Sequence, residues 1–205
     1  NHNFNREWLA RCQKVLKPNG TIWVSGTAHI IPSVGFAMQQ LGFKLLNDIT
    51  WVKPNPPPNL SCRYFTHATE TVIWSAKSDK SKHYFDYKQM RQLAGNRQMK
   101  SFWTEFSKNG ECAPDFWVET PPTNGEKAHG KHPTQKPVAL LERIIRASTK
   151  PFDLVLDPFM GSGTTAVAAR RLGRKFVGIE LDAAFVDVAR ERLQEVQTQQ
   201  SLQLQ

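Results

Sequence analysis

The residues best suited to chemistry lie in a glycine-containing turn and in one acidic residue downstream of it. The turn reads Asp157-Pro158-Phe159-Met160-Gly161-Ser162-Gly163-Thr164-Thr165, and Glu180 follows the next apolar run. Glycines let the backbone turn sharply and approach a ligand closely. A helix that begins at Thr164 would direct free N–H groups toward that ligand, and a carboxylate at the end of the next strand can accept hydrogen bonds from two ribose hydroxyls. The combination predicts a site for a nucleoside-containing cofactor.

The glycine spacing alone does not identify this cofactor. Gly161-x-Gly163-x-x-Ala166 also fits a loose form of the dinucleotide-binding fingerprint, so a nicotinamide-dependent dehydrogenase is the most distant alternative. Asp157 argues against it, because the dinucleotide motif needs no carboxylate at the end of the strand. A carboxylate there suits a cofactor with an ammonium group, and S-adenosylmethionine has both an ammonium group and a ribose diol.

Strands and helices that alternate along the chain must position this turn. Apolar spacing predicts helices over 5–17, 33–41, 137–149, 164–172 and 182–196, and strands over 21–25, 45–52, 70–74, 153–157 and 175–180. Strand 21–25 is expected to be buried, and strand 153–157 to be buried on both faces. This alternation predicts an α/β fold with a mainly parallel sheet.

Residues 77–131 interrupt the alternation with a polar, loop-rich segment of weak periodicity. The stretch 77–108 holds eight Lys or Arg against three Asp or Glu, in a chain of 205 residues whose net charge is +9. Such a basic chain favours a polyanionic partner, most often nucleic acid. The alternative for this stretch is a solvated basic loop.

The composition disfavours several other classes of protein. Hydrophobic residues make up 40% of the chain, which is enough for a buried core, and no apolar run approaches the roughly 18 residues that would span a bilayer. No basic-then-apolar leader is visible. Cys12, Cys62 and Cys112 form no Cys-x-x-Cys pair, so we expect reduced thiols in a cytoplasmic protein and no metal site.

Several motifs resemble those of the β-class DNA amino-methyltransferases, the adenine-N6 and cytosine-N4 enzymes of restriction–modification systems. The segment 157–165 resembles their S-adenosylmethionine loop, and the preceding His132-Pro133-Thr134-Gln135-Lys136-Pro137 is typical of the β-class order of motifs. Gly26-Thr27-x-His29 and Trp51-x-Lys53-x-Asn55 also resemble the family, and 55–63 looks closest to the adenine-N6 enzymes. The resemblance implies a Rossmann-like, S-adenosylmethionine-dependent methyltransferase fold.

The same resemblance assigns roles to individual residues. Asp157 and Phe159 would hold the cofactor, with Asp157 near its ammonium group, and Glu180 would take the ribose hydroxyls. The methionine end would be lined by Gly161, Ser162, Gly163 and Thr164, and its carboxylate would meet His132, Thr134 and Lys136. Basic residues expected to contact double-stranded DNA are Arg63, Lys88, Arg91, Arg97 and Lys100.

The resemblance also implies a domain organisation. Residues 1–76 would form the catalytic-side half of the methyltransferase core, 77–131 a target-recognition insert, 132–196 the cofactor-binding half, and 197–205 a disordered tail. The family's catalytic tetrapeptide, Asp/Asn/Ser-Pro-Pro-Tyr/Phe, does not occur in this sequence. In the β-class order it belongs before residue 1, so we expect the chain to be a C-terminal portion of the enzyme, without the catalytic motif.

The expected function is therefore methyl transfer from S-adenosylmethionine to the N6 amino group of adenine in DNA. The alternatives are a cytosine-N4 methyltransferase and, because the tetrapeptide is absent, a non-catalytic fragment that binds cofactor or DNA. A cognate restriction endonuclease and a second copy of the chain are further expected partners.

Overall fold

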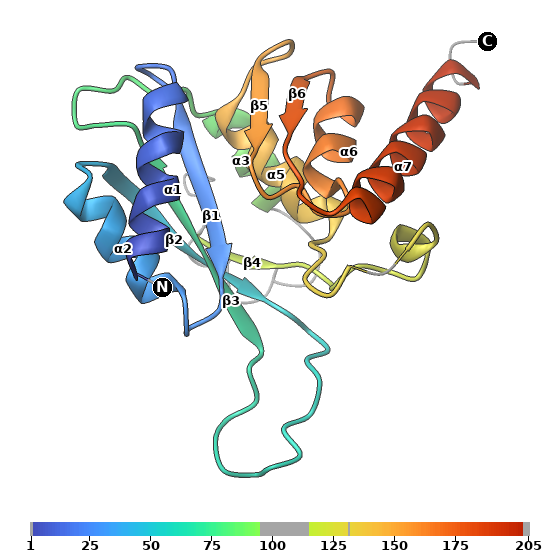
Figure 1. Cartoon of the computed structure of the whole chain (residues 1–205), viewed down its shortest axis with the longest axis horizontal. Helices are drawn as coiled ribbons and strands as arrows, with labels where there is room; N and C mark the ends of the chain where they lie inside the picture. Colours follow the sequence, from blue (N-terminus) through green and yellow to red (C-terminus); the bar gives the residue numbers. More distant parts are fainter. Residues whose placement is uncertain (1, 95–114, 131, 203–205) are drawn as a thin grey trace. The chain divides into compact units, whose positions relative to one another are not determined.

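The computed structural model describes residues 2–94, 115–130 and 132–202 (Figure 1). The chain divides into two compact units, Asn1–Glu119 and Thr120–Gln205. Arg97, Lys100 and Cys112 lie outside the described residues. Among the helices that are described, none is long and apolar enough to cross a membrane.

The first unit contains a four-stranded mixed sheet in the order β1-β3-β2-β4. Its strands are β1 (Thr21–Gly26), β2 (Lys44–Val52), β3 (Thr69–Ala76) and β4 (Phe116–Val118). β3 runs antiparallel to both β1 and β2, whereas β4 pairs with β2 in parallel. The α/β class is confirmed, but this sheet is mixed rather than mainly parallel, because β2 and β3 are joined by a loop and not by a crossover helix.

Two helices supply much of the core of the first unit. α1 (His2–Val15) ends just before Lys17-Pro18, and α2 (Ile31–Gln40) is followed by Gly42, whose φ of 75° reverses the chain. Their buried side chains pack together with residues from the sheet and from the turn after α2, and this cluster contains Leu9, Val34, Ala37, Met38, Phe43 and Ile73. Both helices match the predicted ones to within three residues at each end.

Two expectations for the first unit need correction. β1 is only partly buried, with Ser25 exposed, and among the described residues of the first unit it pairs with β3 alone. The segment after β3 is less irregular than expected, since it includes α3 (Tyr87–Ala94) and the strand β4, which extends the sheet.

The second unit is built from α5 (Val138–Ser148), β5 (Leu154–Asp157), α6 (Thr164–Arg171), β6 (Lys175–Gly178) and α7 (Ala183–Leu202). β5 and β6 pair in parallel. The three helices share a core, formed by Val138, Ile145, Val167, Ala168, Ala169 and Val196, against which Val155 and Phe176 of the strands pack. Order and type of all five elements agree with the prediction.

Two expectations for the second unit are wrong. β5 is not buried on both faces, because Leu154 and Leu156 remain 55% and 40% exposed. Within the second unit, the helices cover the face that holds Val155. The expected tail is also helical as far as Leu202, because α7 continues without interruption beyond Val196, which is itself a buried core residue.

Candidate functional site

The glycine turn connects β5 to α6 and is shaped by Asp157, the last residue of the strand. The backbone N–H of Phe159 donates to Asp157 Oδ1 at 3.0 Å, and Thr165 Oγ1 donates to Asp157 Oδ2 at 2.6 Å. Both carboxylate oxygens therefore bind groups of the turn itself. Asp157 organises the loop, and this is a role that the sequence motif did not reveal.

Gly161 and Gly163 have positive φ angles of 52° and 79°, which residues with a side chain rarely adopt. They also allow close packing. A Cβ atom at Gly163 would lie 2.6 Å from Cβ of Ala189 on α7, and one at Gly161 would lie 3.1 Å from Nε2 of His132. The turn is thus fitted tightly between α7 and the segment 132–136.

Glu180 lies two residues after the end of β6, not at the end of the strand as predicted. Its Oε2 accepts the Gly161 N–H at 2.8 Å, and its Oε1 accepts the N–H groups of Leu181 and Asp182 at 2.8 and 3.0 Å. These hydrogen bonds, that from Asp182 above all, lower the pKa of Glu180 below its ordinary value. An ionised carboxylate offers about four lone pairs, so acceptor capacity remains for a ligand.

The segment 132–136 lies beside the turn, as the proximity of His132 to Gly161 shows. The His132 ring packs edge-on against Phe185 of α7, with 4.4 Å between ring centroids. Its Nδ1 accepts the Thr134 N–H at 3.3 Å, and Lys136 Nζ donates to the Thr134 carbonyl at 3.4 Å. Phe159, by contrast, is 55% exposed.

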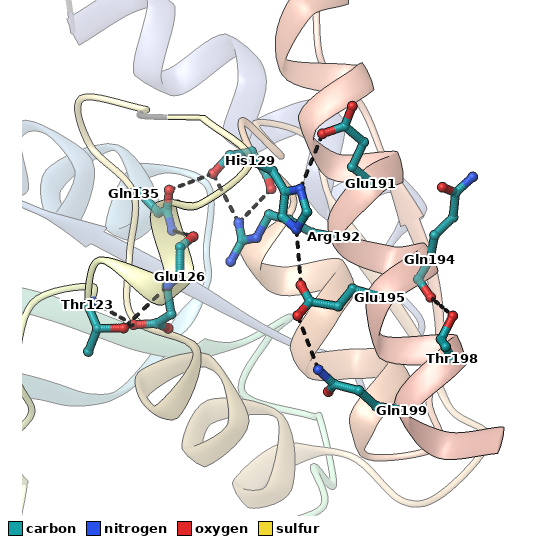
Figure 2. A network of polar contacts seen from close by, with 11 residues as sticks. Thr123, Glu126, His129, Gln135, Glu191, Arg192, Gln194, Glu195, Thr198 and Gln199 are labelled. Carbon is teal, nitrogen blue, oxygen red and sulfur yellow. Dashed lines mark hydrogen bonds and ion pairs between the residues drawn. The ribbon is translucent and has the colours of Figure 1, made fainter. Parts of the chain in front are cut away.

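A buried arginine that the sequence analysis missed, Arg192, donates hydrogen bonds to the turn (Figure 2). Arg192 of α7 is 6% exposed, and its Nη1 donates to the Ser162 carbonyl at 2.6 Å, to Ser162 Oγ at 3.1 Å and to Thr164 Oγ1 at 3.2 Å. Burial lowers the pKa of its guanidinium from the ordinary value. No local pattern distinguishes Arg192 from the exposed charges of the same helix.

Gln135, which lies inside the predicted motif but was given no role, joins the two predicted segments. Ser162 Oγ donates to Gln135 Oε1 at 3.2 Å, and Gln135 Nε2 donates to the Glu126 carbonyl at 2.8 Å. Glu126 in turn accepts the N–H groups of Thr123 and Val138 at 2.9 and 2.7 Å. This network, of which Figure 2 shows Thr123, Glu126 and Gln135, fixes the segment before α5 against the glycine turn.

His129 attaches the same segment to α7. Its two ring nitrogens lie 3.3 Å from Glu191 and 3.1 Å from Glu195, one turn apart on the helix (Figure 2). The three parts of the candidate site, namely the turn, segment 132–136 and the residue after β6, are therefore held by one set of polar contacts within the second unit.

The arrangement suits a ligand with both a diol and a zwitterionic end. Glu180 is a fixed acceptor and Lys136 is a cation. The first N–H groups of α6 lie outside the helix hydrogen-bond ladder, whose first bond runs from the Val167 N–H to the Gly163 carbonyl.

The candidate DNA contacts that the structure describes lie in the first unit. Arg63 is exposed in the loop between β2 and β3, and Lys88 is exposed on α3, which also contains Arg91. Arg97 and Lys100 fall outside the described residues, so their roles stay predictions.

Comparison with known proteins identifies relatives of the chain. Residues 1–191 match the sequence profile of a family described as DNA methylase. The chain is 54% identical over 194 residues to the type II methyltransferase M2.DpnII of Streptococcus pneumoniae, covering 94% of this chain and 67% of the relative. It is 48% identical over 195 residues to M2.MboI of Moraxella bovis, covering 95% and 66%. The chain spans about two thirds of the length of the curated relatives it matches.

Solved structures agree with this grouping. The crystal structure of an M1.HpyAVI–SAM complex is 33% identical, with a TM-score of 0.73, and the match covers 93% of this chain and 83% of that one. The PvuII cytosine-N4-specific DNA methyltransferase shares the fold, with 24% identity and a TM-score of 0.74. That match covers 93% of this chain and 70% of the PvuII chain. The predicted Rossmann-like methyltransferase fold is thereby confirmed, and the chain belongs to the DNA methylase family.

Proposed function

We propose that this protein takes part in transferring a methyl group from S-adenosylmethionine to the N6 amino group of adenine in DNA. The observation that carries the proposal is the glycine turn with Glu180, whose Oε2 accepts the Gly161 N–H at 2.8 Å. Membership of the DNA methylase family and the 54% identity to a type II methyltransferase support it.

The described residues fit S-adenosylmethionine. Gly161 leaves room where a Cβ would press on His132, and Glu180 keeps acceptor capacity for a ribose diol. Lys136 and Thr134 would hold the carboxylate of the amino-acid end, and Asp157 would be near its ammonium group, as the sequence predicts. When bound, this cofactor supplies an electrophilic methyl group on a sulfonium.

The contribution of this chain's own residues to such a reaction is positioning. An exocyclic amine on a base is a weak nucleophile, because its lone pair is delocalised into the ring, so geometry must supply much of the acceleration. Glu180 and Gly161 are fixed to each other, and Arg192 fixes Ser162 and Thr164. A ligand therefore meets groups that need little reorganisation on binding.

The test combines binding and transfer. Calorimetry with S-adenosylmethionine should show binding that Glu180→Gln weakens about 10-fold or more, since a charged acceptor is lost. Glu7→Gln, at an exposed carboxylate on α1, is the matched control and should bind normally. Binding of a nicotinamide dinucleotide in place of S-adenosylmethionine would contradict the proposal.

The transfer measurement uses labelled S-adenosylmethionine and mixed-sequence DNA, followed by nucleoside analysis. N6-methyladenine is the expected product. N4-methylcytosine would establish the cytosine alternative instead. Cofactor binding without label on any DNA would support a non-catalytic fragment.

Finer roles stay predictions. These are target recognition by 77–131, the cofactor contacts of Phe159 and Ser162, a cognate restriction endonuclease, a homodimer, and action in the cytoplasm. Within 77–131, we expect the exposed side chain of Lys88 on α3 to contact the DNA backbone.

A further inference from the structure

The loop between β2 and β3, residues 53–68, extends away from the sheet and carries large apolar side chains in solvent (Figure 1). Leu60 is 90% exposed, Phe65 is 96% exposed and Tyr64 is 61% exposed. Isolated exposed apolar residues need no explanation, but three within six residues at the tip of one loop indicate a surface that meets a partner.

The tip is ordered by its own hydrogen bonds. Asn59 Oδ1 accepts the N–H and the hydroxyl of Ser61 at 3.1 and 2.7 Å, and Asn59 Nδ2 donates to the Tyr64 carbonyl at 2.6 Å. Cys62 reverses the chain with a φ of 52°. These contacts restrain the backbone of the turn from which Leu60 and Phe65 project into solvent.

The arms of the loop are restrained as well. Pro54, Pro56, Pro57 and Pro58 limit the outgoing arm, and the Lys53 N–H donates to the Ala68 carbonyl at 2.8 Å where the loop closes. Lys53 Nζ also pairs with Glu70 at 2.5 Å. A loop that is already ordered loses little conformational entropy when it binds, so its exposed side chains can contribute to affinity.

Charge favours a nucleic acid as the partner. No Asp or Glu occurs between Lys53 and Glu70, and Arg63, which is exposed at the tip, is the charged residue of that stretch. A cation beside apolar side chains is complementary to duplex DNA, in which a negatively charged phosphate lies beside the apolar faces of the bases. Proteins that unstack DNA use apolar wedges in this way, beside basic contacts to the backbone.

We propose that the tip of this loop is a wedge that contacts duplex DNA. Arg63 binds a backbone phosphate, and Phe65 with Leu60 places apolar surface against a base step and unstacks it. The inference rests on the proposed function, because an enzyme that modifies a base must take that base out of the stack.

The experiment uses the full chain and a duplex that contains 2-aminopurine, whose fluorescence rises when it is unstacked. Phe65→Ser should weaken binding, measured by anisotropy, about 10-fold and reduce the fluorescence rise. Phe152→Ser changes a side chain that is also exposed, at 79%, but lies between α5 and β5, and should alter neither signal. Because both positions are exposed, both variants should fold, and circular dichroism checks this.

A second pair of variants tests the phosphate contact. Arg63→Ala should reduce the slope of log affinity against log salt by about 1. Arg11→Ala, at an exposed arginine of α1, should leave the slope unchanged.

The inference would be overturned if Phe65→Ser bound and unstacked DNA as well as the wild-type protein does. It would also be overturned if the loop variants changed only the oligomeric state, because the tip would then be a protein–protein interface. Methyl transfer by the wild-type protein separates the two proposals. If transfer occurs and Phe65→Ser binds DNA normally, the wedge alone fails. If the wild-type protein neither binds nor methylates DNA, both fail.

Discussion

Replacing Gly163 by alanine measures how closely the glycine turn must pack. Gly163 and Gly173 lie at the two ends of α6 and have similar φ angles, 79° and 68°. An alanine at either site must adopt the left-handed conformation, at a cost of about 1–2 kcal/mol. The surroundings differ, because a Cβ at Gly173 has no atom within 4 Å, whereas one at Gly163 lies 2.6 Å from Cβ of Ala189.

The packing difference sets the expected magnitudes. Gly173→Ala should destabilise the protein by about 1–2 kcal/mol from backbone strain alone. Gly163→Ala should add about 1–3 kcal/mol of overpacking, for a total of about 2–5 kcal/mol. It should also weaken S-adenosylmethionine binding, because the turn must shift, whereas Gly173→Ala should not.

The assay is urea unfolding followed by far-ultraviolet circular dichroism, since all six tryptophans lie before the second unit. A double-mutant cycle with Ala189→Gly isolates the contact. Removing that methyl group should recover about 1–3 kcal/mol of the loss in Gly163→Ala. Equal destabilisation by the two glycine variants, or no coupling with Ala189→Gly, would refute this account of the turn.

Three further predictions concern the polar contacts of the same site. Arg192→Met should lower the free energy of unfolding, measured in urea, by about 1.5–3 kcal/mol, because hydrogen bonds from a buried cation are lost. The control Arg190→Met, at an exposed arginine on the same helix, should lower it by less than about 0.5 kcal/mol. Because the folded-state pKa of Glu180 is lowered, its contribution to stability is full above the ordinary pKa of a glutamate and is lost as the pH falls through the lower folded-state value. Unfolding free energies of wild type and Glu180→Gln should therefore converge in acid, and a constant gap would contradict the hydrogen-bond explanation. Asp157→Ala leaves the Phe159 N–H and the Thr165 hydroxyl without their acceptor, so it should lower the free energy of unfolding by about 1–2 kcal/mol and weaken cofactor binding in calorimetry. Unchanged affinity would show that Asp157 is not part of the binding site.

The sequence by itself determined the family and the order of elements outside residues 77–131. Apolar periodicity and breakers such as Pro18 and Gly42 are local signals, so the helices and strands on either side of them were predicted nearly as observed. The glycine turn and segment 132–137 were also recognisable, because their residue types are needed at fixed spacing along the chain.

Burial and strand direction could not be predicted in the same way. The spacing of β2 and β3 allowed either a parallel crossover or a hairpin, and pairing decided for the hairpin. Likewise, the apolar sequence of β5 is the same whether helices cover one face of the strand or both. Which side chains of β5 are buried depends on the helices that pack against it.

Only the tertiary structure revealed what holds the site together. Arg192 lies 30 residues from Ser162 and belongs to no local motif, whereas Gln135 lies 27 residues from Ser162 inside a recognisable motif that does not reveal this contact. A buried hydrogen-bond network depends on which side chains folding brings within about 3 Å, and this is set by the packing of α7 against the turn. The sequence therefore predicts which residues meet a ligand, and the packing of the fold decided which residues keep them in place.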